Sequence, residues 1–282
     1  MPYPLPVTAT PSLSGDDLAA LETAVAALEK TSFAHRLAGL AGKQLGFAVR
    51  VIPERLQRAA STAAATALKA ALRAAIASLD GKPARDQAAL HRRLAMASGA
   101  IGGAAGLASL AVELPISTTI MLRAIADIAR REGEDLREPE AALACLQVFA
   151  LSGGSRDADP LDGGYFALRG LLAKEVSDAA RYIAQRGVAD EAAPVLVRLI
   201  GQIAARYGVV VSQKAAAQAV PIIGAISGAA INLAFTKHFQ TLSRGHFTVR
   251  RLERRYGPPL VRAEYARIAF ASGHWRERAG AA

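Results

Sequence analysis

The chain has 282 residues, 52% of them hydrophobic and only 5% aromatic, so we expect a sizeable core built mainly from Ala, Leu, Ile and Val. A single cysteine excludes an internal disulfide framework, and the first six residues lack the basic and apolar segments of a secretory signal. We therefore expect a cytoplasmic protein, and its formal net charge is +10.

The positive charge is concentrated in the C-terminal quarter. Residues 209–282 hold 11 basic and 3 acidic side chains, whereas residues 94–208 hold 11 basic and 14 acidic ones. Four arginines at i, i+1, i+4 and i+5 predict a basic stripe on a helix: Arg250, Arg251, Arg254 and Arg255. Such a stripe attracts anionic lipid headgroups or phosphates, although it is equally typical of a solvated helix face.

In chain order, the first predicted helix is capped by Ser14, carries Asp16 and Asp17 in its first turn, and ends near Thr31. Apolar residues at helical spacing predict a second helix over about 53–79.

A long helix is expected from about residue 84 into an uncharged run at 94–112, and Pro115 breaks or restarts it. The helix that follows ends at Gly133. Further helices are expected over 139–151, 165–185, 192–207 and 209–219, the last two separated by Gly208.

Glycines near helical-turn spacing occur in the uncharged run at 94–112 and in a second one at 215–236. We predict that they lie at close helix crossings: Gly103, Gly106, Gly224 and Gly228. Each run approaches the roughly 20 residues that span a bilayer, but Gly, Ala and Ser contribute little transfer free energy. The composition favours a soluble or peripheral protein over one that inserts a Gly-rich hairpin.

These patterns predict an all-α fold, a multi-helix bundle with Gly/Ala-rich central helices. Residues 1–83 would form an N-terminal helical arm and helix, residues 84–272 a helical domain, and residues 273–282 a flexible tail.

Two sets of motifs resemble the EcsC family, named after a protein encoded beside an ABC transporter. The first set is Glu113-Leu-Pro115, Leu122-Arg123, Gly133-Glu134-Asp135-Leu136 and Pro139-Glu140, and the second is Pro221-Ile-Ile-Gly224, Gly228, Asn232 and the Arg-rich segment up to Gly257. The resemblance covers about residues 85–270, which makes 84–272 an EcsC-like domain. It implies a helical, membrane-associated bacterial accessory protein and supplies no mechanism.

Glu113 is the sharpest candidate, because it is the only charge between Arg93 and Arg123. A carboxylate among apolar residues must lie exposed at a helix break, form an ion pair, or stay protonated. It is either an acid/base or ligand anchor, coupled to Arg123, or a structural cap or ion-pair partner, and we favour the structural role. Asn232 is expected to cross-link packed helices, and Asp135 to be a loop charge.

No catalytic or cofactor motif is evident. The five histidines are dispersed, without the spacing of a zinc site, and the glycines fit neither a P-loop nor a dinucleotide fold, so we expect no metal and no cofactor. The lone Cys145 is expected to be a buried apolar residue.

We therefore expect a non-catalytic accessory or interaction protein, peripheral to the inner face of the cytoplasmic membrane. Its partner would be an anionic membrane surface or a membrane protein complex. A homo-oligomer is a further alternative, whereas the sequence argues against nucleic acid as a partner. The alternative is a helical enzyme or small-molecule or lipid-binding protein with a polar pocket around Glu113 and Arg123.

Overall fold

The computed structural model describes residues 12–30, 33, 34, 36, 37, 52–77, 110–153, 164–186, 193–218 and 224–272. Several predictions fall outside these residues: the long helix from residue 84, the glycines Gly103 and Gly106, and the tail at 273–282.

The described residues form α-helices, one 3-10 helix and no strand, which confirms the all-α prediction. The helices are α1 (Gly15–Lys30), α3 (Glu54–Ala77), α5 (Leu110–Arg131), α6 (Pro139–Gln147), α8 (Tyr165–Arg186), α9 (Pro194–Gln218), α10 (Gly224–Tyr256) and α11 (Pro258–Ala271), with the 3-10 helix η2 (Val148–Gly153) following α6.

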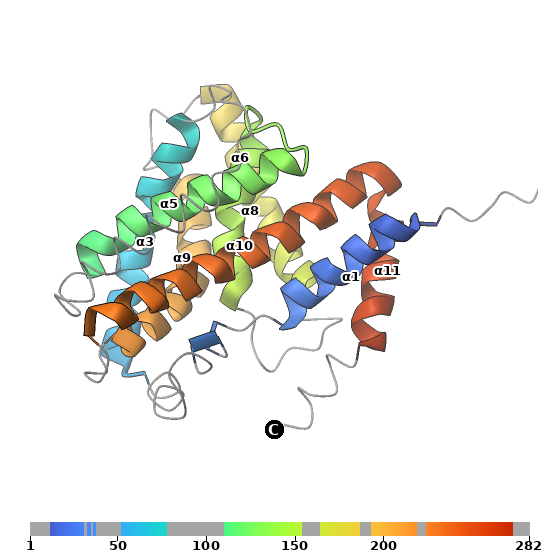
Figure 1. The fold of residues 1–282 in the computed structure, drawn as a ribbon. Helices are drawn as coiled ribbons and strands as arrows, with labels where there is room; N and C mark the ends of the chain where they lie inside the picture. Colours follow the sequence, from blue (N-terminus) through green and yellow to red (C-terminus); the bar gives the residue numbers. More distant parts are fainter. Residues whose placement is uncertain are drawn as a thin grey trace, which may run out of the picture.

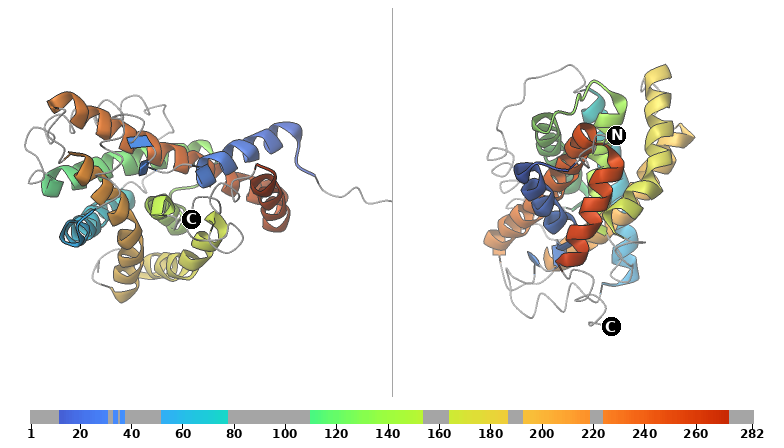
Figure 2. Two further views of the ribbon diagram at one scale, coloured as in Figure 1. Left: turned by 90° about the horizontal axis from the view of Figure 1, so that it is seen from below. Right: turned by 90° about the vertical axis from the view of Figure 1, so that its right-hand side faces the viewer.

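The long helix α10 crosses the whole molecule, with α5 beside it (Figure 1). Helices α3 and α9 pack closely together behind this pair, while α1 and α11 lie against the C-terminal half of α10 (Figures 1 and 2). One hydrophobic core joins residues from all of these helices, including α1 and α3. The predicted N-terminal arm and helix are therefore built into the same core as the later helices.

Local signals set the ends of two helices as predicted. The Ser14 hydroxyl accepts a hydrogen bond from the amide of Asp17 at 3.3 Å, which caps α1. At the end of α5, Gly133 has a φ of 81°, and the amides of Gly133 and Glu134 bond to the carbonyls of Arg130 and Ala129 at 3.0 Å each. These two bonds form a Schellman motif, which turns the chain sharply out of α5.

Two sequence expectations were wrong. Helix α9 runs unbroken through Gly208, and α5 runs through Pro115. Pro115 is tolerated because it lies early in α5 and removes only one backbone donor.

Among the described residues, two glycines lie at close helix crossings. A Cβ added at Gly208 would lie 2.6 Å from Oγ and 2.9 Å from Cα of Ser61 on α3. A Cβ at Gly245 would lie 2.9 Å from Cγ of Leu28 and 3.2 Å from the carbonyl oxygen of Ala24 on α1. At Gly208 the backbone of α3 lies closer than a Cβ would allow, and at Gly245 a Cβ would press on the Leu28 side chain and the backbone of α1. The predicted pair Gly224 and Gly228 lies in the first turns of α10, and its packing role stays a prediction.

Helix α9 is the one described helix that is long and apolar enough to cross a membrane by length and composition. More than half of that stretch is buried by other helices, as in the core helix of a soluble protein.

Gly208→Ala is expected to lower the free energy of unfolding by about 1 to 3 kcal/mol, because the new methyl overlaps the backbone of α3. Gly201→Ala on the same helix is the control. A Cβ there meets nothing within 4 Å, so it should stabilise the helix by about 0.5 to 1 kcal/mol. Urea denaturation of both variants measures the difference, and equal effects would contradict a close crossing at Gly208.

Candidate functional site

A buried ion pair joins α5, α9 and α10. Lys214 of α9 donates from Nζ to Oε1 of Glu113 at 2.5 Å and to Oδ1 of Asn232 at 2.9 Å. The Lys214 side chain is fully buried, and that of Glu113 is 4% exposed. Gln218 also donates to Glu113, at 3.5 Å. Both charges are thus compensated inside the protein, and the Asn232 amide links two helices as predicted.

The surroundings of the pair are mostly apolar and aromatic. The Lys214 ammonium lies 4.9 Å from the centre of the Phe235 ring, where a cation–π attraction adds to the ion pair. Nearby, the hydroxyls of Thr118 and Tyr207 are 2.8 Å apart and hydrogen-bonded. Burial lowers the pKa of Lys214, and the charge and hydrogen bond of Glu113 offset this only in part.

The structure does not bring Arg123 to Glu113. The two residues are ten positions apart on α5, about 15 Å along the helix axis, and Arg123 is exposed. Asp135 is also on the surface, where it accepts hydrogen bonds from Arg137 that lower its pKa to about 2. Lys214 takes the place that the sequence had suggested for Arg123.

The predicted arginine stripe forms a second cluster, which we call the arginine clamp: Arg250, Arg251, Arg254 and Arg255 with Asp17, Glu132 and Glu134. Arg250 donates to both carboxylate oxygens of Glu134, at 2.8 and 3.0 Å, and Arg254 donates to the same carboxylate.

The remaining contacts of the arginine clamp link α10 to Asp17 of α1 and to Glu132. Arg251 donates to Glu132 at 2.8 Å and to Asp17 at 2.9 Å. Arg255 and the hydroxyl of Tyr256 bond to Asp17 as well, at 2.9 and 2.8 Å. All four arginines of the predicted stripe therefore have carboxylate partners within the chain.

Two carboxylates of the arginine clamp, those of Glu134 and Asp17, are held in their charged form. Burial on its own raises the pKa of Glu134, but the hydrogen bonds and charges of Arg250 and Arg254 outweigh it and the pKa is lowered. The pKa of Asp17 is lowered chiefly by its hydrogen bond from Arg251. The clamp thus depends on ionised carboxylates.

The two clusters lie at opposite ends of the α5–α10 pair. Glu113 and Asn232 are near the N-terminal ends of these helices, whereas Glu134 and Arg250 are near their C-terminal ends. Each cluster joins a motif from the first half of the chain to one from the second half.

Those motifs are the ones that resemble the EcsC family, and the match to that family covers residues 18–252, most of the chain. The chain belongs to the EcsC protein family. No curated protein and no solved structure matches it.

This EcsC-family chain also buries two histidines on α10. Nδ1 of His246 is 2.8 Å from the hydroxyl of Tyr165, whose pKa burial raises to about 12. His238 packs against Phe33 and Phe239, and burial lowers its pKa to about 3. Both imidazoles are neutral at physiological pH, and His246 is hydrogen-bonded to Tyr165 whereas His238 packs against aromatic rings.

The one cysteine and the potential metal ligands among the described residues show no reactive arrangement either. Cys145 is buried as predicted, and burial raises the pKa of its thiol to about 12, so the thiolate is disfavoured at neutral pH. Among the described residues, no three His, Cys, Asp or Glu side chains are grouped so as to hold a metal ion.

Sequence reasoning missed Lys214 and Asp17. Lys214 is the charge that immediately precedes the second uncharged run, just as Glu113 is the lone charge beside the first. Two opposite charges, each isolated beside an apolar stretch, are a signal that could have paired them. Asp17 was recognised only as a helix-dipole residue, because its arginine partners lie 234 and 238 positions away.

Glu113→Gln is expected to lower the free energy of unfolding by about 3 to 5 kcal/mol, because it leaves the Lys214 ammonium buried without a counter-charge. The double variant Glu113→Gln/Lys214→Met removes both charges and should recover most of that loss. Denaturation of the wild type, of Glu113→Gln, of Lys214→Met and of the double variant measures the coupling free energy between the two residues. Losses of stability that simply add would contradict a direct ion pair.

The stability of the same variants is expected to depend on pH in different ways. Because the pKa of Lys214 is lower in the fold than in the unfolded chain, the unfolded chain binds more protons between the two values, and stability rises with pH there. Without Glu113 the folded pKa falls further and this window widens. Glu113→Gln should therefore regain stability as pH rises towards about 10, and Glu113→Gln/Lys214→Met should not.

Glu134→Gln tests the arginine clamp, with the exposed neighbour Asp135→Asn as control. Losing the charge-assisted bonds to Arg250 should cost about 1.5 to 3 kcal/mol in Glu134→Gln, whereas Asp135→Asn should change stability little. The pKa of Glu134 is lowered by folding, so its contribution is lost as pH falls through the folded value, and the gap to the wild type should close in acid. A gap that persists in acid below the folded pKa of Glu134 would show that the charge is not responsible.

Proposed function

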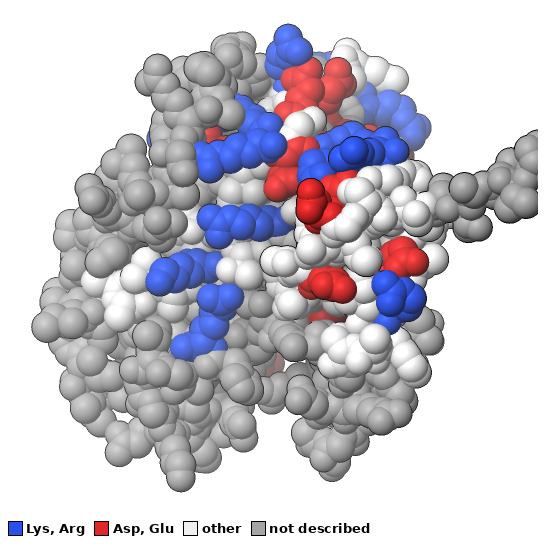
Figure 3. All heavy atoms as spheres, turned by 45° about the vertical axis from the view of Figure 1, so that its right-hand side comes forward, with Lys and Arg blue, Asp and Glu red and all other residues white. Residues whose placement is uncertain are grey.

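We propose that this EcsC-family protein is a non-catalytic accessory protein that attaches peripherally to an anionic membrane surface through the solvent face of α10. The observation that carries this proposal is a pair of exposed cations on that face, Lys237 and Arg244, which have no carboxylate partner among the described residues. Arg36 lies on the same side of α10, where it donates to Thr241 at 3.2 Å. A column of basic side chains lies on a face of the molecule that includes α10 (Figure 3).

The proposed anion-binding residues therefore differ from the arginine stripe that the sequence suggested. Because Asp17, Glu132 and Glu134 neutralise much of their charge, those arginines offer less attraction to a membrane than an unpaired cation does. Each unpaired basic residue near an anionic leaflet contributes roughly 1 kcal/mol, and salt screens the attraction beyond about 8 to 10 Å. The contact would be salt-sensitive and reversible, which suits a peripheral protein.

The buried amine of Lys214 favours a second candidate, a small-molecule binder or enzyme. A lysine whose pKa is lowered by burial beside a carboxylate is a common feature of functional sites. In that case Glu113 and Lys214, rather than Glu113 and Arg123, would be the working pair. A Glu113→Gln/Lys214→Met protein that is stable but inactive in the cell would favour this candidate, and a stable and active one would dismiss it.

Vesicle flotation tests the membrane proposal. Lys237→Gln/Arg244→Gln should bind vesicles containing phosphatidylglycerol about thirtyfold more weakly than the wild type, as expected for two contacts of about 1 kcal/mol each. The control Lys174→Gln/Arg198→Gln removes the same charge from exposed positions on α8 and α9 and should bind like the wild type. Equal binding of the wild type to neutral and anionic vesicles would refute the proposal.

A further inference from the structure

One large apolar side chain is exposed on the α5–α10 pair, that of Ile116, which is 50% exposed. The other large apolar side chains that are exposed among the described residues lie on α8, α9 and α11. Ile120, one turn further along α5, is half-buried. Single exposed apolar residues are common on protein surfaces, so the surroundings of Ile116 decide its role.

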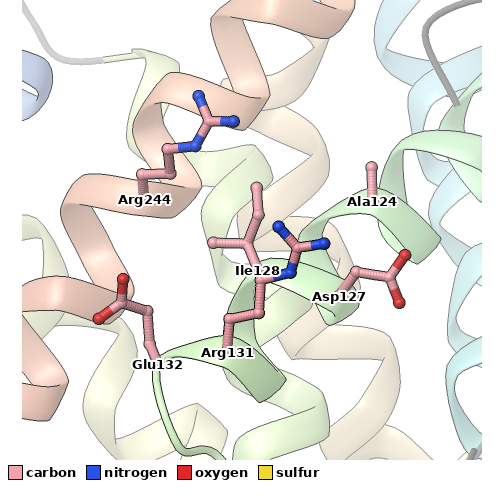
Figure 4. Close-up of a pocket in the computed structure, with 6 residues that line it drawn as sticks. All are labelled: Ala124, Asp127, Ile128, Arg131, Glu132 and Arg244. Atoms are coloured by element: carbon pink, nitrogen blue, oxygen red, sulfur yellow. The ribbon is translucent and has the colours of Figure 1, made fainter. Parts of the chain in front are cut away.

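Ile116 lies on the side of α5 that adjoins the exposed face of α10. The spacing i, i+4, i+7 and i+11 marks a single helix face, and on α5 it is the spacing of Ile116, Ile120, Arg123 and Asp127. Asp127 lines a small hollow of about 90 Å³ between the two helices, and Arg244 of α10 lines the same hollow (Figure 4). This side of α5 therefore opens to the same solvent as the exposed face of α10.

Ile116 is also level with an exposed cation of α10. The two helices run parallel, and Lys214 bonds to both Glu113 of α5 and Asn232 of α10, which brings these two residues to the same height. Ile116 lies three residues beyond Glu113, and Lys237 lies five residues beyond Asn232. At a rise of about 1.5 Å per residue, Ile116 and Lys237 are roughly level along the helix axes.

The exposed charges of this part of the pair are all positive. Residues 114–126 of α5 and residues 224–252 of α10 contain no Asp or Glu. The exposed basic residues in these two stretches are Arg123, Lys237 and Arg244. The carboxylates of the hollow, Asp127 and Glu132, lie beyond this region, towards the C-terminal end of α5. An anionic bilayer suits such a surface, because its headgroups attract the cations while an apolar side chain passes below them.

We propose that Ile116 enters the acyl layer of an anionic membrane while Arg123, Lys237 and Arg244 contact the headgroups. The inference rests on the membrane attachment proposed above and adds an apolar anchor to an electrostatic contact. Burying the exposed half of one isoleucine strengthens binding roughly fivefold to tenfold. Salt screens the attraction of the cations but leaves this apolar contribution in place, so part of the attachment persists at high ionic strength.

Flotation with phosphatidylglycerol vesicles at low and high salt separates the two contributions. Ile116→Ser should bind roughly fivefold to tenfold more weakly than the wild type at both salt concentrations. Lys237→Gln/Arg244→Gln should lose binding chiefly at low salt and keep the residual binding at high salt. The control Leu171→Ser removes a side chain that is 65% exposed on α8, which packs on α6 and α9, and it should bind like the wild type.

Tryptophan emission gives a second readout that is specific to the position. The chain has one tryptophan, Trp275, so Ile116→Trp and Leu171→Trp are each combined with Trp275→Phe. On bound vesicles the emission of Ile116→Trp should shift to shorter wavelength, because its indole leaves water, whereas that of Leu171→Trp should not shift.

Two outcomes overturn the apolar anchor and leave membrane attachment standing. They are binding of Ile116→Ser that equals the wild type at both salt concentrations, and an unshifted emission of Ile116→Trp on vesicles that have bound the protein. A wild type that binds anionic and neutral vesicles equally overturns the electrostatic attachment itself.

Discussion

The buried contact between Lys214 and Glu113 is the constraint on which the arrangement of the helices depends. Removing two charges from water costs several kcal/mol per ion, and only near-ideal geometry repays that cost. The pair, with Asn232 as a third member, is satisfied only when α5, α9 and α10 occupy one relative position. An apolar contact tolerates sliding between helices, but a buried ion pair does not, so this cluster sets the register of the three helices.

The arginine clamp acts differently at the other end of the α5–α10 pair. Its arginine side chains range from 17% exposed in Arg250 to 61% exposed in Arg255, so its charges lose less hydration than Lys214 does. Each exposed contact contributes modestly, whereas a network that shares carboxylates among several arginines contributes more. The clamp fastens α1 and the turn after α5 to a helix whose position the buried pair has already determined.

Local features were predictable from the sequence, and long-range ones were not. The Ser14 cap and the Gly133 turn follow from backbone chemistry within a few residues, and both were anticipated. The arginine stripe was recognised as a helix face, but its partners depend on which surfaces meet after folding. Gly208 was misread as a helix end because a glycine that breaks a helix and one that admits Ser61 of a neighbouring helix look alike in the sequence. Glu113 was identified, but its partner was sought on its own helix.

The contact of Asp17 with Arg251 joins residues 234 positions apart, near the two ends of the chain. During synthesis, α1 is made before α10, so its acidic first turn lacks its arginine partners until α10 has been translated. Its apolar face, with Leu21 and Val25, must wait as well, because α1 packs mainly on α10 and α11. Contacts of such long sequence separation form late and slowly, since the entropy of closing the intervening chain must be overcome first. The nascent chain therefore carries an unpartnered helix with an apolar face until α10 and α11 have been translated, which makes this stage the one most open to aggregation or to capture by a chaperone.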